Sequence, residues 1–236
     1  MALPTNNEQT NYSSVVDNVR RWFNEMPSNA SSPDYYSYFN DFMSAQDYAT
    51  GDWTLTTVET GTATEVTSTG VAGGTLIVTN GTADNDSDSF QAKNEGFKLA
   101  SGKPCWMEMK VKVSDADQED LFIGLAITDT TPLDASDKIG FLIVDDNINL
   151  NFVATKNSTT TTMDTEYDVL DDTYVVVGWH FDGAGRVEYF VNREYKGTVT
   201  TNICDDEELA ITMHHQNGTN AAKVLTVDYI WVLQQR

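Results

Sequence analysis

From residue 53 onward, apolar residues recur at every second position in one short segment after another, with turn residues between the segments. The clearest segment, residues 106–113, alternates methionine or valine with glutamate or lysine. Because side chains alternate between the two faces of a strand, we expect Met107 and Val111 to face a core and Glu108 to face water. The other segments that we read as strands of this kind are 53–58, 75–79, 148–153, 174–181, 187–191, 195–199, 209–213 and 223–233.

Two further segments, 121–127 and 139–144, are apolar without interruption. This pattern is typical of central strands covered on both faces, either inside the sandwich or under a second layer on the outer side. Helical spacing is nearly absent after residue 50, and turn signals separate about twelve short strands. Residues 155–164, with their run of threonines, are expected to form a polar loop. The chain is therefore predicted to be all-β, an antiparallel two-sheet jelly-roll sandwich spanning residues 51–236.

The first 50 residues differ from the rest. Ser13 and Ser14 are possible helix caps, and after them apolar residues follow at helical spacing until Pro27. An aromatic cluster at 35–42 is expected to be helical or irregular. We interpret 1–50 as a helical and aromatic arm that packs on its own domain, on another copy, or on a different protein. Its predicted contact residues are Val15, Val19, Trp22 and Phe23. Deleting this arm is expected to leave a folded sandwich that no longer assembles.

The charge balance is strongly acidic, with 36 Asp and Glu against 14 Lys and Arg and a formal net charge of −22. Phosphate contacts need clusters of lysine and arginine, so we exclude direct binding of nucleic acid and of anionic membranes. The acidity reflects either solubility or a salty habitat, or it has a role in the choice of partner. No apolar run approaches the roughly 18 residues of a membrane span, and no signal-peptide pattern opens the chain. Synthesis in the cytoplasm would leave Cys105 and Cys204 reduced and buried.

One acidic segment has the spacing of a calcium loop. Asp84, Asp86, Asp88 and Glu95 match its first, third, fifth and twelfth positions. However, Ser89 stands where glycine makes the turn, and no helical pattern flanks the segment. Two interpretations remain, a calcium site or a solvated acidic loop, and the second is favoured.

Other chemistry finds little support in the sequence. His180, His214 and His215 are the three histidines, and no nucleophile-elbow motif or zinc-ligand cluster accompanies them. The adjacent pair His214 and His215 should point to opposite faces of a strand. We predict no cofactor. Four tryptophans fall in predicted strands, where they either pack in the core or stack on sugars: Trp53, Trp106, Trp179 and Trp231.

Three segments, taken in order, resemble the concanavalin-A-like jelly roll of lectins, glucanases and laminin-G-like domains. The first is 97–99 with 103–113. The second is 179–192, an apolar strand, an Asp-Gly turn and a strand ending in Tyr-Phe-Val-Asn, followed by Arg193 where the family usually has glycine. The third is 227–232, which resembles the closing strand that pairs near the N-terminal strand.

The whole chain also resembles sandwich proteins of tailed-bacteriophage virions, in which a short N-terminal segment precedes such a jelly roll. This resemblance implies a capsid decoration (cement) protein on the capsid surface, assembled as a homotrimer on the major capsid protein. Glycosidases of this fold need two carboxylates close together, and residues 106–113 hold only Glu108. We therefore expect a non-enzymatic structural protein. The alternative is a carbohydrate-binding, lectin-like module for host-surface glycans.

Overall fold

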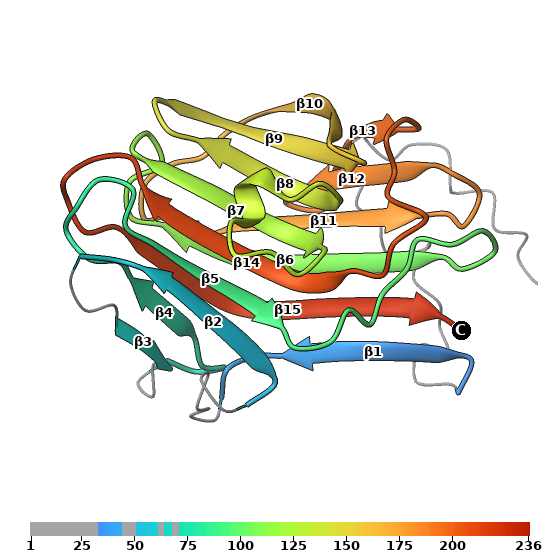
Figure 1. Ribbon diagram of the computed structural model, residues 1–236, viewed down its shortest axis with the longest axis horizontal. Coiled ribbons are helices and arrows are strands. Elements are labelled where there is room, and N and C mark those ends of the chain that lie inside the picture. The colour runs from blue at the N-terminus through green and yellow to red at the C-terminus, as the bar shows by residue number, and fades with distance from the viewer. Residues whose placement is uncertain (1–32, 44–50, 61–63, 68–70) are drawn as a thin grey trace, which may run out of the picture.

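The computed structural model describes residues 33–43, 51–60, 64–67 and 71–236, which form two antiparallel sheets stacked face to face (Figure 1). Among these residues, sheet A has eight strands. Seven follow the order β13 (Glu194–Val199), β12 (Val187–Val191), β11 (Val175–Phe181), β6 (Cys105–Val113), β15 (Val224–Gln235), β4 (Leu76–Thr79) and β3 (Thr64–Thr67), and β1 (Tyr35–Asn40) pairs with the far half of β15. Sheet B has, in the same part of the chain, seven strands in the order β10 (Thr159–Asp168), β9 (Asn147–Lys156), β8 (Lys138–Val144), β7 (Glu119–Ala126), β14 (Ala210–Asn217), β5 (Ser87–Ala92) and β2 (Trp53–Val58). The two-sheet sandwich is therefore confirmed.

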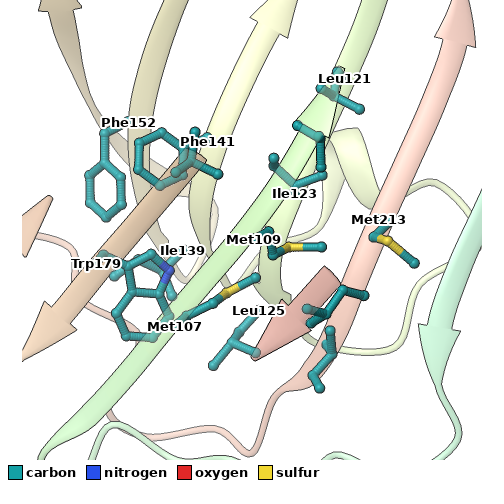
Figure 2. Packing of buried hydrophobic residues seen from close by; sticks show 14 of the residues in the cluster. Met107, Met109, Leu121, Ile123, Leu125, Ile139, Phe141, Phe152, Trp179 and Met213 are labelled. Carbon is teal, nitrogen blue, oxygen red and sulfur yellow. The ribbon is translucent and has the colours of Figure 1, made fainter. Parts of the chain in front are cut away.

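The core lies between the sheets and follows from the alternation of the strands. Met107 and Met109 point inward from β6 and meet Ile123 and Leu125 from β7, with Trp179 of β11 beside them (Figure 2). All five are at most 3% exposed. Fully burying an apolar side chain of this size stabilises the fold by about 1.5–3 kcal/mol, so the interlocking faces hold the sheets together.

A second, smaller cluster covers the outer face of sheet B. Phe122 and Ala126 of β7 and Val153 of β9 are buried there under Ala135, which belongs to the connection between β7 and β8. This connection contains the short 3-10 helix η1 (Pro132–Asp134) and crosses the face of β7 (Figure 1). The uninterrupted apolar pattern of β7 is thus explained by burial on both faces, as predicted.

Buried polar side chains tie this connection to the sheet beneath it. Lys138 donates from its ammonium to the carbonyl groups of Pro132 and Leu133. Gln91 of β5 donates to the carbonyl of Ile127 at 3.1 Å. Carbonyl groups that lose contact with water need such donors, which is why a lysine and a glutamine stand at these positions.

The predicted irregular or helical aromatic cluster at 35–42 is wrong for its first six residues. Tyr35–Asn40 is strand β1, registered with β15 from Tyr35 opposite Gln235 to Asn40 opposite Ile230. The family-derived expectation that the closing strand pairs near an N-terminal strand is confirmed by this ladder. The predicted helix and its contact residues, Val15, Val19, Trp22 and Phe23, lie outside the described residues.

Two other segments expected to be loops are strands. The threonine run belongs to β10, an edge strand whose side chains are mostly exposed, and a run of identical polar residues gives no apolar alternation in the sequence. The acidic segment contains β5, where polar residues are buried because neighbouring strands supply partners. Ser89, for example, bonds to His214, and Gln91 bonds to Thr212 at 3.0 Å. In both strands tertiary contacts override a polar pattern.

Two smaller expectations have different outcomes. Cys105 and Cys204 are free and buried, as predicted, and burial raises the pKa of the Cys204 thiol to about 12. Glu108, expected in water, is only 5% exposed, because Arg193 and Tyr229 close over it on the outer face of sheet A. No helix among the described residues has the length and apolar character needed to cross a membrane.

Candidate functional site

Four connections converge at the end of the sandwich where β11 stops and β12 starts, at the right of Figure 1. They are residues 98–104, the β9–β10 turn, the β11–β12 turn and the β13–β14 loop. Between them lies a pocket of about 380 Å³, which we call the end pocket. Its volume falls in the range of about 300–1,000 Å³ that is usual for small-molecule sites. Its lining residues are Leu99, Ser101, Lys156, Phe181, Ala184, Gly185, Thr200, Asn202, Ile203 and Asp205.

The end pocket has an apolar base and polar walls. Leu99, Phe181 and Ile203 form the base, and each is at most 7% exposed because it is also part of the core. Thr200 and Asp205, by contrast, are exposed at the rim. A rigid apolar floor under a few polar groups is the usual composition of a site that holds a small ligand in one orientation.

The β11–β12 turn is fixed by one carboxylate. Asp182 accepts hydrogen bonds from the backbone amides of Ala184 (2.7 Å) and Arg186 (3.1 Å) and from the Arg186 guanidinium (3.2 Å). Burial alone would raise the pKa of Asp182, but these donors outweigh it and lower the pKa. Gly183 sits at φ 74° and accepts a bond from the Gly102 amide at 2.7 Å, which clamps the turn onto the 98–104 loop. The wall formed by Ala184 and Gly185 is therefore preorganised.

An acidic run in the β13–β14 loop is held by two lysines. Lys156 pairs with Asp205 and, at 3.3 Å, with Asp206. Lys98 pairs with Glu208 at 3.0 Å and donates to the carbonyl of Asp206 at 2.8 Å. Hydrogen bonding to Asp205 raises the pKa of the Lys156 ammonium, which stays charged. Exposed ion pairs add little stability, so their effect here is to position the loop.

Several polar groups in the end pocket remain open to a ligand. Asp205 uses Oδ1 for Lys156, and its Oδ2 receives no hydrogen bond from the described residues. Asn202 donates from Nδ2 to Thr161 at 2.9 Å, which leaves its carbonyl oxygen as an acceptor. The hydroxyl groups of Ser101 and Thr200 complete the set. This arrangement can hold a compact molecule rich in hydroxyl groups.

The residues proposed for calcium do not come together. Asp84 is exposed, whereas Asp86 and Asp88 are buried and Glu95 reaches the start of the β7–β8 connection. Each of the latter three has its own donor: Asp86 accepts from Thr60, Asp88 from Thr57 and Glu95 from Thr128. The described residues contain no group of three or more His, Cys, Asp or Glu placed to hold a metal ion. The structure gives the calcium interpretation no support.

Nothing in the sequence patterns singled out the end pocket. Its lining residues come from four separate connections, and although Phe181, Ala184 and Gly185 belong to the Asp-Gly turn segment 179–192, that segment indicated the fold and not a binding site. The local signals were the acidic run at 205–208 and, separate from it in the chain, the glycine-containing turn at 182–185, which a search for unusual loops could have found. The tryptophans that the structure describes do not line it: Trp53 and Trp179 are core residues, and Trp106 is buried against His180.

His214 lies on the outer face of sheet B, and its Nδ1 is 2.7 Å from the Ser89 hydroxyl. The next residue, His215, points inward to Glu119 at 2.7 Å, so the expectation of opposite faces is confirmed. Burial, and secondarily the nearby charges of His215 and Lys138, lower the pKa of His214 to about 4. At neutral pH its imidazole is therefore uncharged.

This lowered pKa predicts an acid-sensitive stability. The unfolded chain binds a proton at His214 near pH 6.5 and the native chain near pH 4, so the free energy of unfolding falls as the pH drops between these values. Between pH 7 and pH 5 the free energy of unfolding of the wild-type protein should fall by about 2 kcal/mol more than that of the His214→Gln variant. Urea unfolding at each pH measures both values. Parallel pH profiles for the two proteins would contradict the assignment.

Comparison with known proteins identifies the architecture. No protein-family model matches the chain, and no curated protein sequence matches it. Solved structures do match. An endo-1,3-β-glucanase from Streptomyces sioyaensis aligns with a TM-score of 0.61 at 13% identity, covering 89% of this chain and 99% of the enzyme. The carbohydrate recognition domain of Emp47p aligns with a TM-score of 0.59 at 14% identity, covering 87% and 98%.

These comparisons contradict the expectation, drawn from the sequence, that the chain is not an enzyme. Several of the similar structures are enzymes, among them a glucuronan lyase from Trichoderma reesei and an alginate lyase. A carbohydrate esterase from the Shiga toxin-encoding bacteriophage phi24B also aligns, with a TM-score of 0.50 at 16% identity, covering 84% of this chain and 100% of that one. The chain therefore has a concanavalin-A-like jelly-roll fold, which is found both in enzymes that act on polysaccharides and in carbohydrate-recognition domains.

Proposed function

We propose that this domain recognises a carbohydrate and that the end pocket is its binding site. The observation that carries the proposal is the composition of the end pocket, an apolar base under open hydroxyl, amide and carboxylate groups. A sugar ring has the matching surfaces, since its C–H faces suit an apolar base and its hydroxyl groups suit the acceptors around it. The carbohydrate-active and carbohydrate-recognising proteins with the same fold support this choice.

The proposal is tested by filling the end pocket without unfolding the domain. Ala184 is exposed on the pocket wall and belongs to the preorganised β11–β12 turn. Ala184→Trp should weaken binding of a β-1,3-glucan oligosaccharide by at least about tenfold in a calorimetric titration, because the indole occupies the space of the sugar. The control is Asp84→Ala, an exposed substitution at the opposite end of the sandwich, which should leave affinity unchanged.

The outcomes separate binding from catalysis. Equal affinity for both variants would exclude the end pocket as the site. The same mixtures, assayed for newly released reducing ends, show whether the bound glucan is also cleaved. Release of reducing ends would show that the domain is an enzyme that cleaves the glucan. Binding without release would show that it is a recognition domain.

The location on a phage capsid stays a prediction. A homotrimer bound to the major capsid protein rests on the sequence resemblance, and one of the proteins with this fold is encoded by a bacteriophage. The solution mass, measured by light scattering during gel filtration, tests the trimer. Binding a host-surface glycan is compatible with a place on a virion.

A further inference from the structure

Among the open hydrogen-bonding groups of the end pocket, the two hydroxyl groups can donate or accept, and the other two are acceptors alone. Asp205 Oδ2 and the carbonyl oxygen of Asn202 can only accept. Lys156 is the one cation that lines the pocket among the described residues, and its ammonium already donates to Asp205 and approaches Asp206. A neutral sugar supplies a hydroxyl hydrogen for each acceptor. An ionised carboxylate has no hydrogen to donate, so these oxygens disfavour a uronate whose carboxylate points toward them.

The negative charge around the end pocket also disfavours a ligand that carries a carboxylate. The run Asp205–Asp206–Glu207–Glu208 carries four acidic side chains, and the two lysines that hold it neutralise only half of them. The whole chain, this run included, carries a formal net charge of −22. At low ionic strength such a field repels anions over about 10 Å or more. An anionic polysaccharide is therefore disfavoured by charge as well as by hydrogen bonding.

We infer that the end pocket selects uncharged sugars and rejects uronates, an inference that rests on the proposed carbohydrate function. The distinction matters because the same fold occurs in a glucanase and in lyases named for glucuronan and alginate. The pairing of Lys156 with Asp205 and Asp206 sets this specificity, since it engages the one ammonium that lines the pocket in the described part of the chain.

A double substitution that removes the two anionic partners of Lys156 tests this inference. In Asp205→Asn/Asp206→Asn the side chains keep their size, but Lys156 loses both anionic partners and its ammonium becomes available. The wild-type protein should bind a β-1,3-glucan oligosaccharide at least about tenfold more tightly than a mannuronate oligosaccharide of equal length. The double variant should bind mannuronate at least about tenfold more tightly than wild type does, and this gain should shrink with added salt.

The matched control is Asp171→Asn/Asp172→Asn. It removes two adjacent aspartates, one of them paired with Lys112, from the β10–β11 connection at the other end of the sandwich. It makes the same change in net charge, so it isolates the local effect. Equal gains in mannuronate affinity for both double variants would overturn the inference in favour of a general charge effect.

Failure of the inference is distinguishable from failure of the proposed function. A wild-type protein that binds neither oligosaccharide contradicts the proposed function itself. A wild-type protein that binds mannuronate as tightly as glucan, with both affinities lost in Ala184→Trp, keeps the end pocket as a sugar site and refutes only its selectivity.

Discussion

Replacing Gly124 or Gly140 with alanine is expected to destabilise the sandwich by about 3 kcal/mol or more. The two glycines lie directly opposite each other on β7 and β8. A Cβ at Gly124 would lie 2.1 Å from the Ile139 carbonyl oxygen and 2.7 Å from the Gly140 Cα, and one at Gly140 would lie 2.2 Å from the Ile123 carbonyl oxygen. All these atoms are backbone, so relief requires the central strands of sheet B to separate.

The matched control is Gly96→Ala. A Cβ there would meet nothing closer than 3.9 Å, and the backbone does not have a positive φ. This variant should stay within about 0.5 kcal/mol of wild type. Urea unfolding, followed by tryptophan fluorescence, measures both effects as shifts of the midpoint at constant slope. A cost below about 1 kcal/mol for Gly124→Ala would show that the strands separate easily and would contradict the prediction.

Removing residues 1–50 is expected to unfold the sandwich, against the sequence-based expectation that the rest would stay folded. The deletion removes all of β1 and Phe42, which is 2% exposed. Burying a phenylalanine is worth about 3–5 kcal/mol by truncation to alanine, and domains of this kind have about 5–15 kcal/mol in total. It also removes the Tyr36 hydroxyl, which donates to Gln234 at 2.5 Å, and the Tyr38 hydroxyl, which accepts from the Trp53 indole at 3.1 Å.

A shorter deletion provides the comparison. Removing only residues 1–32 keeps β1, its ladder with β15 and Phe42. This protein should retain a β-sheet circular dichroism spectrum and a cooperative urea transition, whereas the longer deletion should show neither. A cooperative transition at an unchanged midpoint after removal of 1–50 would mean that β1 adds little to sheet A. Only the shorter deletion is a suitable test of whether the predicted arm residues drive assembly.

The strands that could be read from the sequence share a physical property, an unambiguous inner face. β6 and β15 alternate because one face meets the core, and β7 is apolar throughout because both faces are covered. The missed strands lack this property. β10 is an exposed edge, and β5 buries serine, aspartate and glutamine whose partners lie on other strands. The threonines of β10 favour strands intrinsically, and the alternation of Met163, Thr165 and Tyr167 with acidic residues was a second signal for it.

The sequence by itself determined an all-β sandwich, because the period of apolar residues depends only on which face of each strand leaves water. It also led to the expectation of two buried thiols, which the structure confirms. The tertiary structure alone decided where a ligand can bind. Ser101, Lys156, Ala184 and Asp205 come from separate connections and meet only when strands distant in sequence pair at the same end of the sandwich. A pocket made by loop convergence leaves no periodic pattern, because its residues are selected for position and not for burial along one strand.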